Sequence, residues 1–318
     1  MFDTIKYLSE IGPHPGGSKE ERKIANYLGQ KIGQYCNELI FDEFEYTDPK
    51  NVNKKSVNVI ASFGEKNARS VLICTNIDTI RDLNKVVDLW EQDIKNVYSV
   101  SYVEGANEPN SAIAFLIYFA EKLSQINFNK NIKIVGFGAQ EEWDAKLRDG
   151  YTTNLSKIIR GKINRLGYLI GSRHYVLSKG INDIDSVIAI DAVGIGSPKI
   201  VIRDSFGKST LTPSLMPGFE KIKIRGFRYK PGKKTVEVIG CDHLPFRIAG
   251  VPSTWIIANK GELTEKNSLG CILNHSNIPN YGTSSDTFEN FIRETSVNTL
   301  KNNYDLISNA LLNFIRKR

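Results

Sequence analysis

Acidic side chains follow several short apolar stretches of the sequence. Glu141, with Glu142 beside it, comes shortly after IKIVGF (132–137). Asp78, Asp191 and Asp242 hold similar positions, Asp242 being followed by His243, and Glu108 precedes an apolar helix. Ligands of open α/β sheets bind outside the carboxyl ends of the strands. After one stretch alone, a solvated turn is an equally good interpretation. Five acids at such positions would meet at one sheet edge if the strands are parallel neighbours, and like charges so close normally need a cation.

Apolar β-branched runs and amphipathic patterns define the elements that must position these acids. The predicted strands cover 38–46, 56–63, 70–75, 132–137, 185–194, 199–203, 235–239 and 253–258, with a weaker one near 98–103. The predicted helices cover 2–10, 18–34, 111–123, 171–180 and 295–316, with a short one after CDHLPF. Strands 38–46 and 56–63 are expected to pair antiparallel.

Two helix starts carry capping signals. Ser18 and Glu21 form a capping box, and Asn110 or Ser111 is the expected cap of the apolar helix over 111–123.

Repeated strand–helix units with buried strands predict a three-layer α/β/α sandwich around a mixed, mostly parallel sheet. No boundary divides residues 1–318, so we expect one domain, with an insertion or lid at about 145–170.

Composition narrows the function classes. The chain has 318 residues, 41% of them hydrophobic, a net charge of +7 and no apolar run near the roughly 18 residues of a membrane span. Without a signal-peptide pattern, we expect a cytoplasmic protein. The four cysteines include no CxxC pair, which indicates neither a thiolate zinc site nor a disulfide framework. The basic stretch 221–234 has the alternation of a half-buried strand with a basic outer face, and nucleic acid is not the expected partner.

Several motifs, taken in order, resemble those of a known family. They are IGPHPGGSKEERKIANYL, CTNIDT, GANEPNSAIAFLIYFAEKL, GAQEE, GSRHYV, IDAVG, DHLPFRIAGVPS and YGTSSDTFEN. Their order and spacing resemble the zinc-dependent aminopeptidases of the bacterial leucyl aminopeptidase type and their glutaminyl cyclase relatives, peptidase family M28. The resemblance implies a zinc-exopeptidase-like fold with two zinc ions at the strand ends.

The chain departs from this family at most positions of the implied metal site. The family's first histidine corresponds to Asn76, its bridging aspartate to Glu108, its general base to Gln140 and its final histidine to Gly282. Glu141 and Asp191 keep the family's ligand identity. The remaining residues that the resemblance places around the ligands, in supporting rather than metal-binding positions, are Asp78, Asp242, His243 and Asp286.

These departures change the chemistry that the site can support. Without imidazoles, the remaining oxygen ligands suit magnesium, calcium or manganese better than zinc, so zinc, one divalent cation or no metal are all open. Gln140 cannot take a proton from metal-bound water, and losing a general base costs on the order of 10²–10⁴-fold in rate. Glu142 could act as the base if the alignment slips by one. His275 or His243 could supply a missing imidazole.

Three functional readings follow. The first is an aminopeptidase-like protein whose peptide-hydrolysing site has degenerated and whose pocket binds a peptide, an amino acid or an acyl compound. The second is an active metal-dependent hydrolase or cyclase-like acyl transferase with single-metal chemistry. The third is an interaction protein that binds polyanions through 221–234. The sequence sets no oligomeric state.

Overall fold

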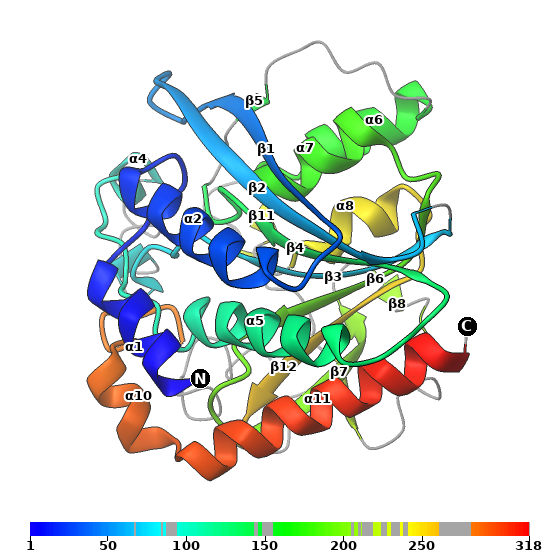
Figure 1. Ribbon diagram of the computed structural model, residues 1–318. Helices are drawn as coiled ribbons and strands as arrows, with labels where there is room; N and C mark the ends of the chain where they lie inside the picture. Colours follow the sequence, from blue (N-terminus) through cyan, green and yellow to red (C-terminus); the bar gives the residue numbers. More distant parts are fainter. Residues whose placement is uncertain are drawn as a thin grey trace.

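A central sheet forms the middle layer of the protein in the computed structural model (Figure 1). The model describes residues 1–66, 68–83, 85–86, 94–142, 146–147, 155–204, 207–208, 211, 219–223, 228–229, 236–237, 241–260 and 281–317. The strands of the sheet, in chain order, are β1 (Glu38–Thr47), β2 (Asn53–Gly64), β3 (Ser70–Asn76), β4 (Asn131–Phe137), β5 (Lys146–Leu147), β6 (Ile184–Asp191), β7 (Ser197–Asp204), β8 (Gly207–Lys208), β9 (Glu220–Lys223) and β12 (Ser253–Asn259). Their spatial order is β5-β1-β2-β4-β3-β6-β12-β7-β8, with β9 on β7.

The centre of the sheet is parallel. Strand β3 runs parallel to β4 and to β6, and β6 runs parallel to β12. On one side β2 and β1 add in antiparallel fashion, and on the other side β7 does so. The predicted mixed, mostly parallel sheet and the antiparallel pairing of the first two strands are therefore confirmed. The four central strands are almost wholly buried, which explains their continuous apolar sequences.

Helices cover both faces of this sheet (Figure 1). One layer holds α1 (Phe2–Ile11), α2 (Lys19–Gly33), α5 (Asn110–Ser124), α10 (Phe288–Glu294) and α11 (Val297–Lys317), and the other holds α6 (Lys157–Asn164), α7 (Ile170–Lys179) and α8 (His243–Ile248). Each layer encloses its own hydrophobic core. Ile24, Phe115 and Leu311 lie in the first, and Phe137, Tyr175 and Phe246 lie in the second. The three-layer sandwich is confirmed.

Helix starts agree with the sequence only in part. The Ser18 hydroxyl accepts a hydrogen bond from the Glu21 N–H at 3.0 Å, as the capping box predicts. Helix α5 instead begins after Pro109, so neither Asn110 nor Ser111 is its cap. The final helix predicted over 295–316 is confirmed as α11, and the Ser296 hydroxyl accepts a hydrogen bond from the Thr299 N–H at its start. The sequence missed the short helix α10 before it, which Thr287 caps.

The weak strand predicted near 98–103 is wrong. A four-residue helix, α4 (Ile94–Val97), precedes it, and among the described residues its β-pairing consists of one isolated bridge between Arg81 and Tyr102. The Arg81 guanidinium donates to the carbonyls of Tyr98 and Val100 at 3.2 and 3.0 Å. A side chain thus takes the acceptors that a neighbouring strand would have used.

Other boundaries also differ. The short helix expected after CDHLPF begins within that motif, at His243. Of the strand predicted over 235–239, the structure describes β11 (Val236–Glu237), which pairs antiparallel with β10 (Arg228–Tyr229) in a separate two-stranded sheet. The predicted insertion at about 145–170 contains β5, which pairs with the edge strand β1, and helix α6.

The side chains of the basic stretch 221–234 lie outside the described residues. Within the part of the chain that is described, no helix is long and apolar enough to span a membrane.

Candidate active site

Three neighbouring parallel strands bring the predicted residues to one edge of the sheet. Asn76 is the last residue of β3 and lies in register with Phe137, the last residue of β4. Asp191 ends β6, which pairs with β3 on its other side. Segment 138–142 therefore leaves the sheet beside Asn76, and Asp191 lies on the other side of Asn76. The polar side chains of Asn76, Glu141 and Asp191 at these strand ends are buried.

The backbone turns sharply where two of these strands end. Ala139 follows β4 with φ of 52°, and Ala192 follows β6 with φ of 45°. Residues other than glycine seldom adopt a left-handed conformation, and such strain persists only where surrounding contacts hold it. The carboxylate of Glu21, on α2, accepts a hydrogen bond from the Ala139 N–H at 2.8 Å and so fixes the first of these turns.

Asp78 holds the segment that carries Gln140 and Glu141. Its two carboxylate oxygens accept hydrogen bonds from the backbone N–H groups of Gln140 and Glu141 at 2.8 and 2.9 Å. Burial raises the pKa of Asp78 well above its ordinary value, and the charges of Glu21 and Glu141 raise it further. Asp78 thus fixes the position of its neighbours through their backbone.

Asp286 does the same for Glu108. Its carboxylate accepts from the backbone N–H groups of Asn107 and Glu108 at 2.7 and 3.2 Å, and its own carbonyl accepts from the Gly105 N–H at 3.0 Å. Burial raises the pKa of Asp286 to about 7. The turn before α5 is therefore tied to a residue far along the chain.

Three buried carboxylic groups at this edge influence one another electrostatically. Burial is the main cause that raises the pKa of Glu108 well above its ordinary value, and Glu141 and Asp191 add to the shift. Burial also raises the pKa of Glu141 to about 7 and that of Asp191 to about 8. Each group is harder to ionise than a free acid because solvent is excluded and like charges are close.

Two side-chain amides donate to these acids. The Asn76 amide nitrogen donates to Glu108 Oε1 at 2.8 Å and to the Asp78 carbonyl at 2.9 Å. The Gln140 amide nitrogen donates to Glu141 Oε1 at 2.7 Å. Glu108 and Glu141 therefore each have a neutral hydrogen-bond donor at their side.

The donor set does not fit the two zinc ions of the resembling family. Zinc is held by imidazole nitrogen, thiolate or carboxylate, and an amide N–H is a donor that cannot coordinate a metal. Among the residues that the structure describes, no group of three or more His, Cys, Asp or Glu side chains could hold a metal ion. Here Asn76 and Gln140 turn amide nitrogens toward the carboxylates that would be ligands.

Gly282, at the position that corresponds to the family's final histidine, has no room beside it for a side chain. Its φ is +61°, and a Cβ there would lie 2.7 Å from Leu83 Cδ1 and 3.3 Å from Ile80 Cγ2. Leu83 also donates its backbone N–H to the Gly282 carbonyl at 2.8 Å. Apolar side chains fill the space into which a side chain would extend.

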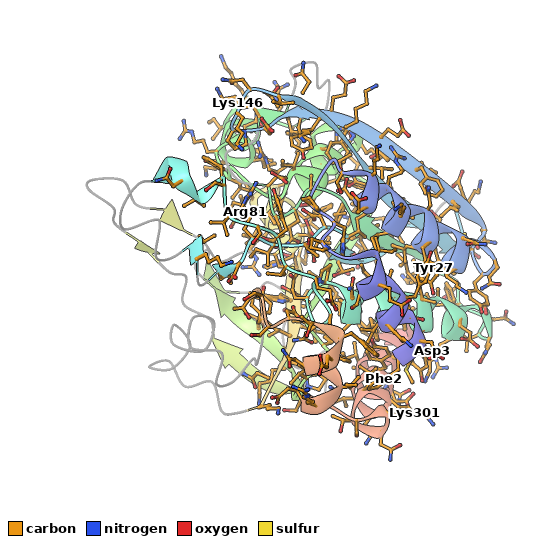
Figure 2. The ribbon with its side chains drawn as sticks, turned by 90° about the vertical axis from the view of Figure 1, so that its left-hand side faces the viewer. Phe2, Asp3, Tyr27, Arg81, Lys146 and Lys301 are labelled. Carbon is orange, nitrogen blue, oxygen red and sulfur yellow. The ribbon has the colours of Figure 1, made fainter. Side chains whose placement is uncertain are left out.

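Glu142, the alternative general base, is engaged elsewhere. It accepts a hydrogen bond from the Tyr102 hydroxyl at 2.6 Å and lies 3.8 Å from the Arg81 guanidinium, which stacks over the Tyr102 ring. Figure 2 labels Arg81, on the segment after β3, well apart in that view from Lys301 of α11. The sequence did not single out Arg81 or Tyr102, because nothing in their spacing shows that one bridge brings them together.

Asp242 and His243 lie at the start of α8, and both are buried. Burial raises the pKa of Asp242 well above its ordinary value, and the charges of Glu141 and Asp191 contribute. His243 packs against Trp255, with ring centroids 6.2 Å apart. Asp242 thus lies near the acids at the strand ends, although its segment does not come from a strand of the main sheet. His275 lies outside the described residues.

Comparisons with known proteins agree with this architecture. The model of peptidase family M28 matches residues 58–308, while no curated protein matches the chain. A leucine aminopeptidase precursor from Bacteroides thetaiotaomicron superposes with a TM-score of 0.67 at 18% identity, covering 100% of this chain and 96% of that one. For a Zn-dependent exopeptidase from Parabacteroides distasonis the values are 0.68, 15%, 100% and 97%.

A glutaminyl cyclase from Tannerella forsythia is similar to the same degree, with a TM-score of 0.66 at 16% identity and coverage of 100% and 97%. At such identities the structural likeness shows a shared fold. The family match extends from β2 into α11 and includes Asn76, Gln140 and Asp191. The chain therefore belongs to peptidase family M28.

Proposed function

We propose that this chain binds a peptide or an amino-acid-like small molecule at the carboxyl edge of its parallel strands and does not hydrolyse peptides by two-zinc chemistry. Gln140 is the single observation that carries this proposal. It stands at the family's general-base position, and its amide nitrogen donates to Glu141 Oε1 at 2.7 Å. An amide cannot accept the proton of an attacking water as a carboxylate does.

The preserved construction of the edge supports binding. Asp78 and Asp286 each hold two backbone N–H groups of the segments that carry Glu141 and Glu108. A site is precise when its side chains stand on segments fixed in this way. Leucine aminopeptidase and glutaminyl cyclase are among the structural neighbours, which supports a ligand related to the amino-terminal end of a peptide.

A second candidate is an active hydrolase or cyclase-like acyl transferase with one divalent cation. It is favoured by the buried carboxylic groups of Glu108, Glu141 and Asp191 at this edge. The charges of Glu141 and Asp191 raise the pKa of Glu108, and the charge of Glu141 raises the pKa of Asp191. This candidate requires one tightly bound metal per chain. It also requires that Glu141→Ala or Asp191→Ala abolish turnover.

Metal analysis of untagged protein, combined with a screen of aminoacyl-nitroanilides under added zinc, tests the proposal. We expect no turnover above the buffer rate, with or without zinc. Thermal-shift and calorimetric titrations with di- and tripeptides then search for the ligand. The same titrations with the Asp191→Asn variant test whether a ligand binds at this edge. Rapid turnover with zinc near two equivalents would show that the proposal is wrong.

A further inference from the structure

The amides of Asn76 and Gln140 have fixed orientations. Asn76 faces Glu108 Oε1 and the Asp78 carbonyl, and because a backbone carbonyl only accepts hydrogen bonds, the amide nitrogen points toward them. The Gln140 amide nitrogen points toward Glu141 Oε1, to which it donates. Turning either amide to offer its oxygen to a cation would place that oxygen against other oxygens.

Both amides are also held by the backbone around them. Asn76 is the last residue of β3, in the parallel ladder with β4, and is 1% exposed. The Gln140 N–H donates to Asp78, and its carbonyl accepts from the Leu169 N–H at 2.9 Å. Side chains placed in this way lose little further freedom when they donate to a carboxylate.

The three departures from the family act together. Asn76 supplies a donor to Glu108, Gln140 supplies a donor to Glu141, and the space at Gly282 is filled by Leu83 and Ile80. A buried carboxylate without a partner is costly, and a cation or a hydrogen-bond donor can each reduce that cost. The chain holds donors where its relatives' carboxylates would meet a cation.

We infer that the Asn76 and Gln140 amides take the place of the metal ions beside Glu108 and Glu141, so that these two acids are stabilised without a cation. The inference concerns how the acids are stabilised, and it goes beyond the proposed function. Peptide turnover by metal-free protein would contradict the absence of turnover that the proposed function predicts, and would leave this inference intact. A protein that took up zinc without turnover would refute this inference alone.

Thermal unfolding of untagged protein, at one pH, with EDTA, zinc, magnesium or calcium, tests the inference. For the unchanged protein we expect Tm shifts below about 1 °C in every condition, and no stoichiometric metal by elemental analysis. An ion present at roughly a hundred times its dissociation constant would raise Tm by roughly 5 °C. A fall of that size with EDTA, or a rise of that size with any of these ions, would overturn the inference.

A double variant, Asn76→Asp with Gln140→Glu, removes both donors with almost no change in shape. We expect it to unfold at a lower temperature and to regain at least roughly 3 °C with one of the divalent ions, because added carboxylates then lack partners. The matched control, Asn309→Asp with Gln30→Glu, makes the same changes at exposed helix positions and should show neither effect.

The outcomes of the variant also decide between the explanations. If the double variant responds to ions no more than the control does, the amides are not substitutes for a cation and the inference fails. If it does not fold, the EDTA and metal titrations of the unchanged protein decide alone.

Discussion

At the scale of single residues, the site differs from a two-zinc peptidase by the direction of a few hydrogen bonds. Asn76 and Gln140 donate to Glu108 and Glu141 through amide nitrogens. Their carboxylate or imidazole counterparts would accept instead. Both positions carry a donor where the family carries an acceptor. Changing one of them back to the family's residue therefore leaves the other position unchanged.

Gln140→Glu alone is therefore expected to restore no peptide turnover. It recreates the family's general base but removes the donor to Glu141 and leaves Asn76 and Gly282 in place. Initial rates with leucyl-nitroanilide and added zinc measure the effect. A rise on the order of 10²-fold above the unchanged protein would mean that the base was the only missing part.

Asp78→Asn is expected to destabilise the protein by about 1–3 kcal/mol. The substitution turns an amide group toward one of the two backbone N–H groups, of Gln140 and Glu141, that Asp78 now accepts, and a buried donor without an acceptor costs about 1–3 kcal/mol. Urea unfolding at pH 7 measures the loss. Asp3→Asn on the exposed face of α1 is the control and should change stability by less than about 1 kcal/mol.

At the scale of elements, the turn before α2 braces the site from outside the sheet. Its His14 is fully buried, donates its backbone N–H to the Thr79 hydroxyl at 3.0 Å, and bonds the Gly12 carbonyl through its ring at 2.7 Å. The Cβ of an alanine at Gly16 would come within 2.8 Å of Ala139 Cα. The turn thus contacts Thr79, which follows Asp78, and Ala139, which precedes the residues whose backbone Asp78 holds.

This turn should make stability depend on pH. Burial lowers the pKa of His14 to about 4, against an ordinary value of 6.5. A histidine with a lowered folded-state pKa contributes stability above the unfolded pKa, and that stability is lost as pH falls from 6.5 toward 4. We expect the unchanged protein to lose about 2 kcal/mol more than His14→Asn between pH 7 and pH 5.

Urea unfolding of both proteins at the two pH values measures this difference. The asparagine amide can still donate to the Gly12 carbonyl, so the comparison removes the titrating group with little change in hydrogen bonding. Equal losses in the two proteins would show that His14 is not the group responsible.

At the scale of the whole molecule, two hydrophobic cores share one sheet. The β3 strand supplies Val71 and Ile73 to one core and Leu72 and Cys74 to the other. Neither helix layer can separate without exposing a face of the same strands. We expect the molecule to unfold as one unit.

Phe115→Ala tests this coupling. The fully buried ring lies in the first core, 5.8 Å from the ring of Phe119 and 5.4 Å from that of Tyr304. We expect a loss of about 3–5 kcal/mol and a single transition. Calorimetry, together with circular dichroism in the far and near ultraviolet, measures both. Two separated transitions would mean that the cores fold independently.

The sequence predicts local elements better than it predicts contacts between distant segments. Buried strands such as β3 and β6 were predictable because an apolar run between polar residues has few other solutions. The 98–103 segment was not, since a side chain of Arg81 takes its carbonyls. The residues Asn76, Gln140 and Gly282 could be located by motif. The amide bonds, the packing of Leu83 on Gly282 and the anchoring by Glu21 depend on contacts between distant segments.

A crystal structure of the untagged protein after a zinc soak, with anomalous data at the zinc edge, tests the central claim most directly. We predict no zinc peak among Glu108, Glu141 and Asp191, and Asn76 and Gln140 still donating to Glu108 and Glu141. A strong peak coordinated by Glu108, Glu141 and Asp191, with either amide turned away, would contradict the claim.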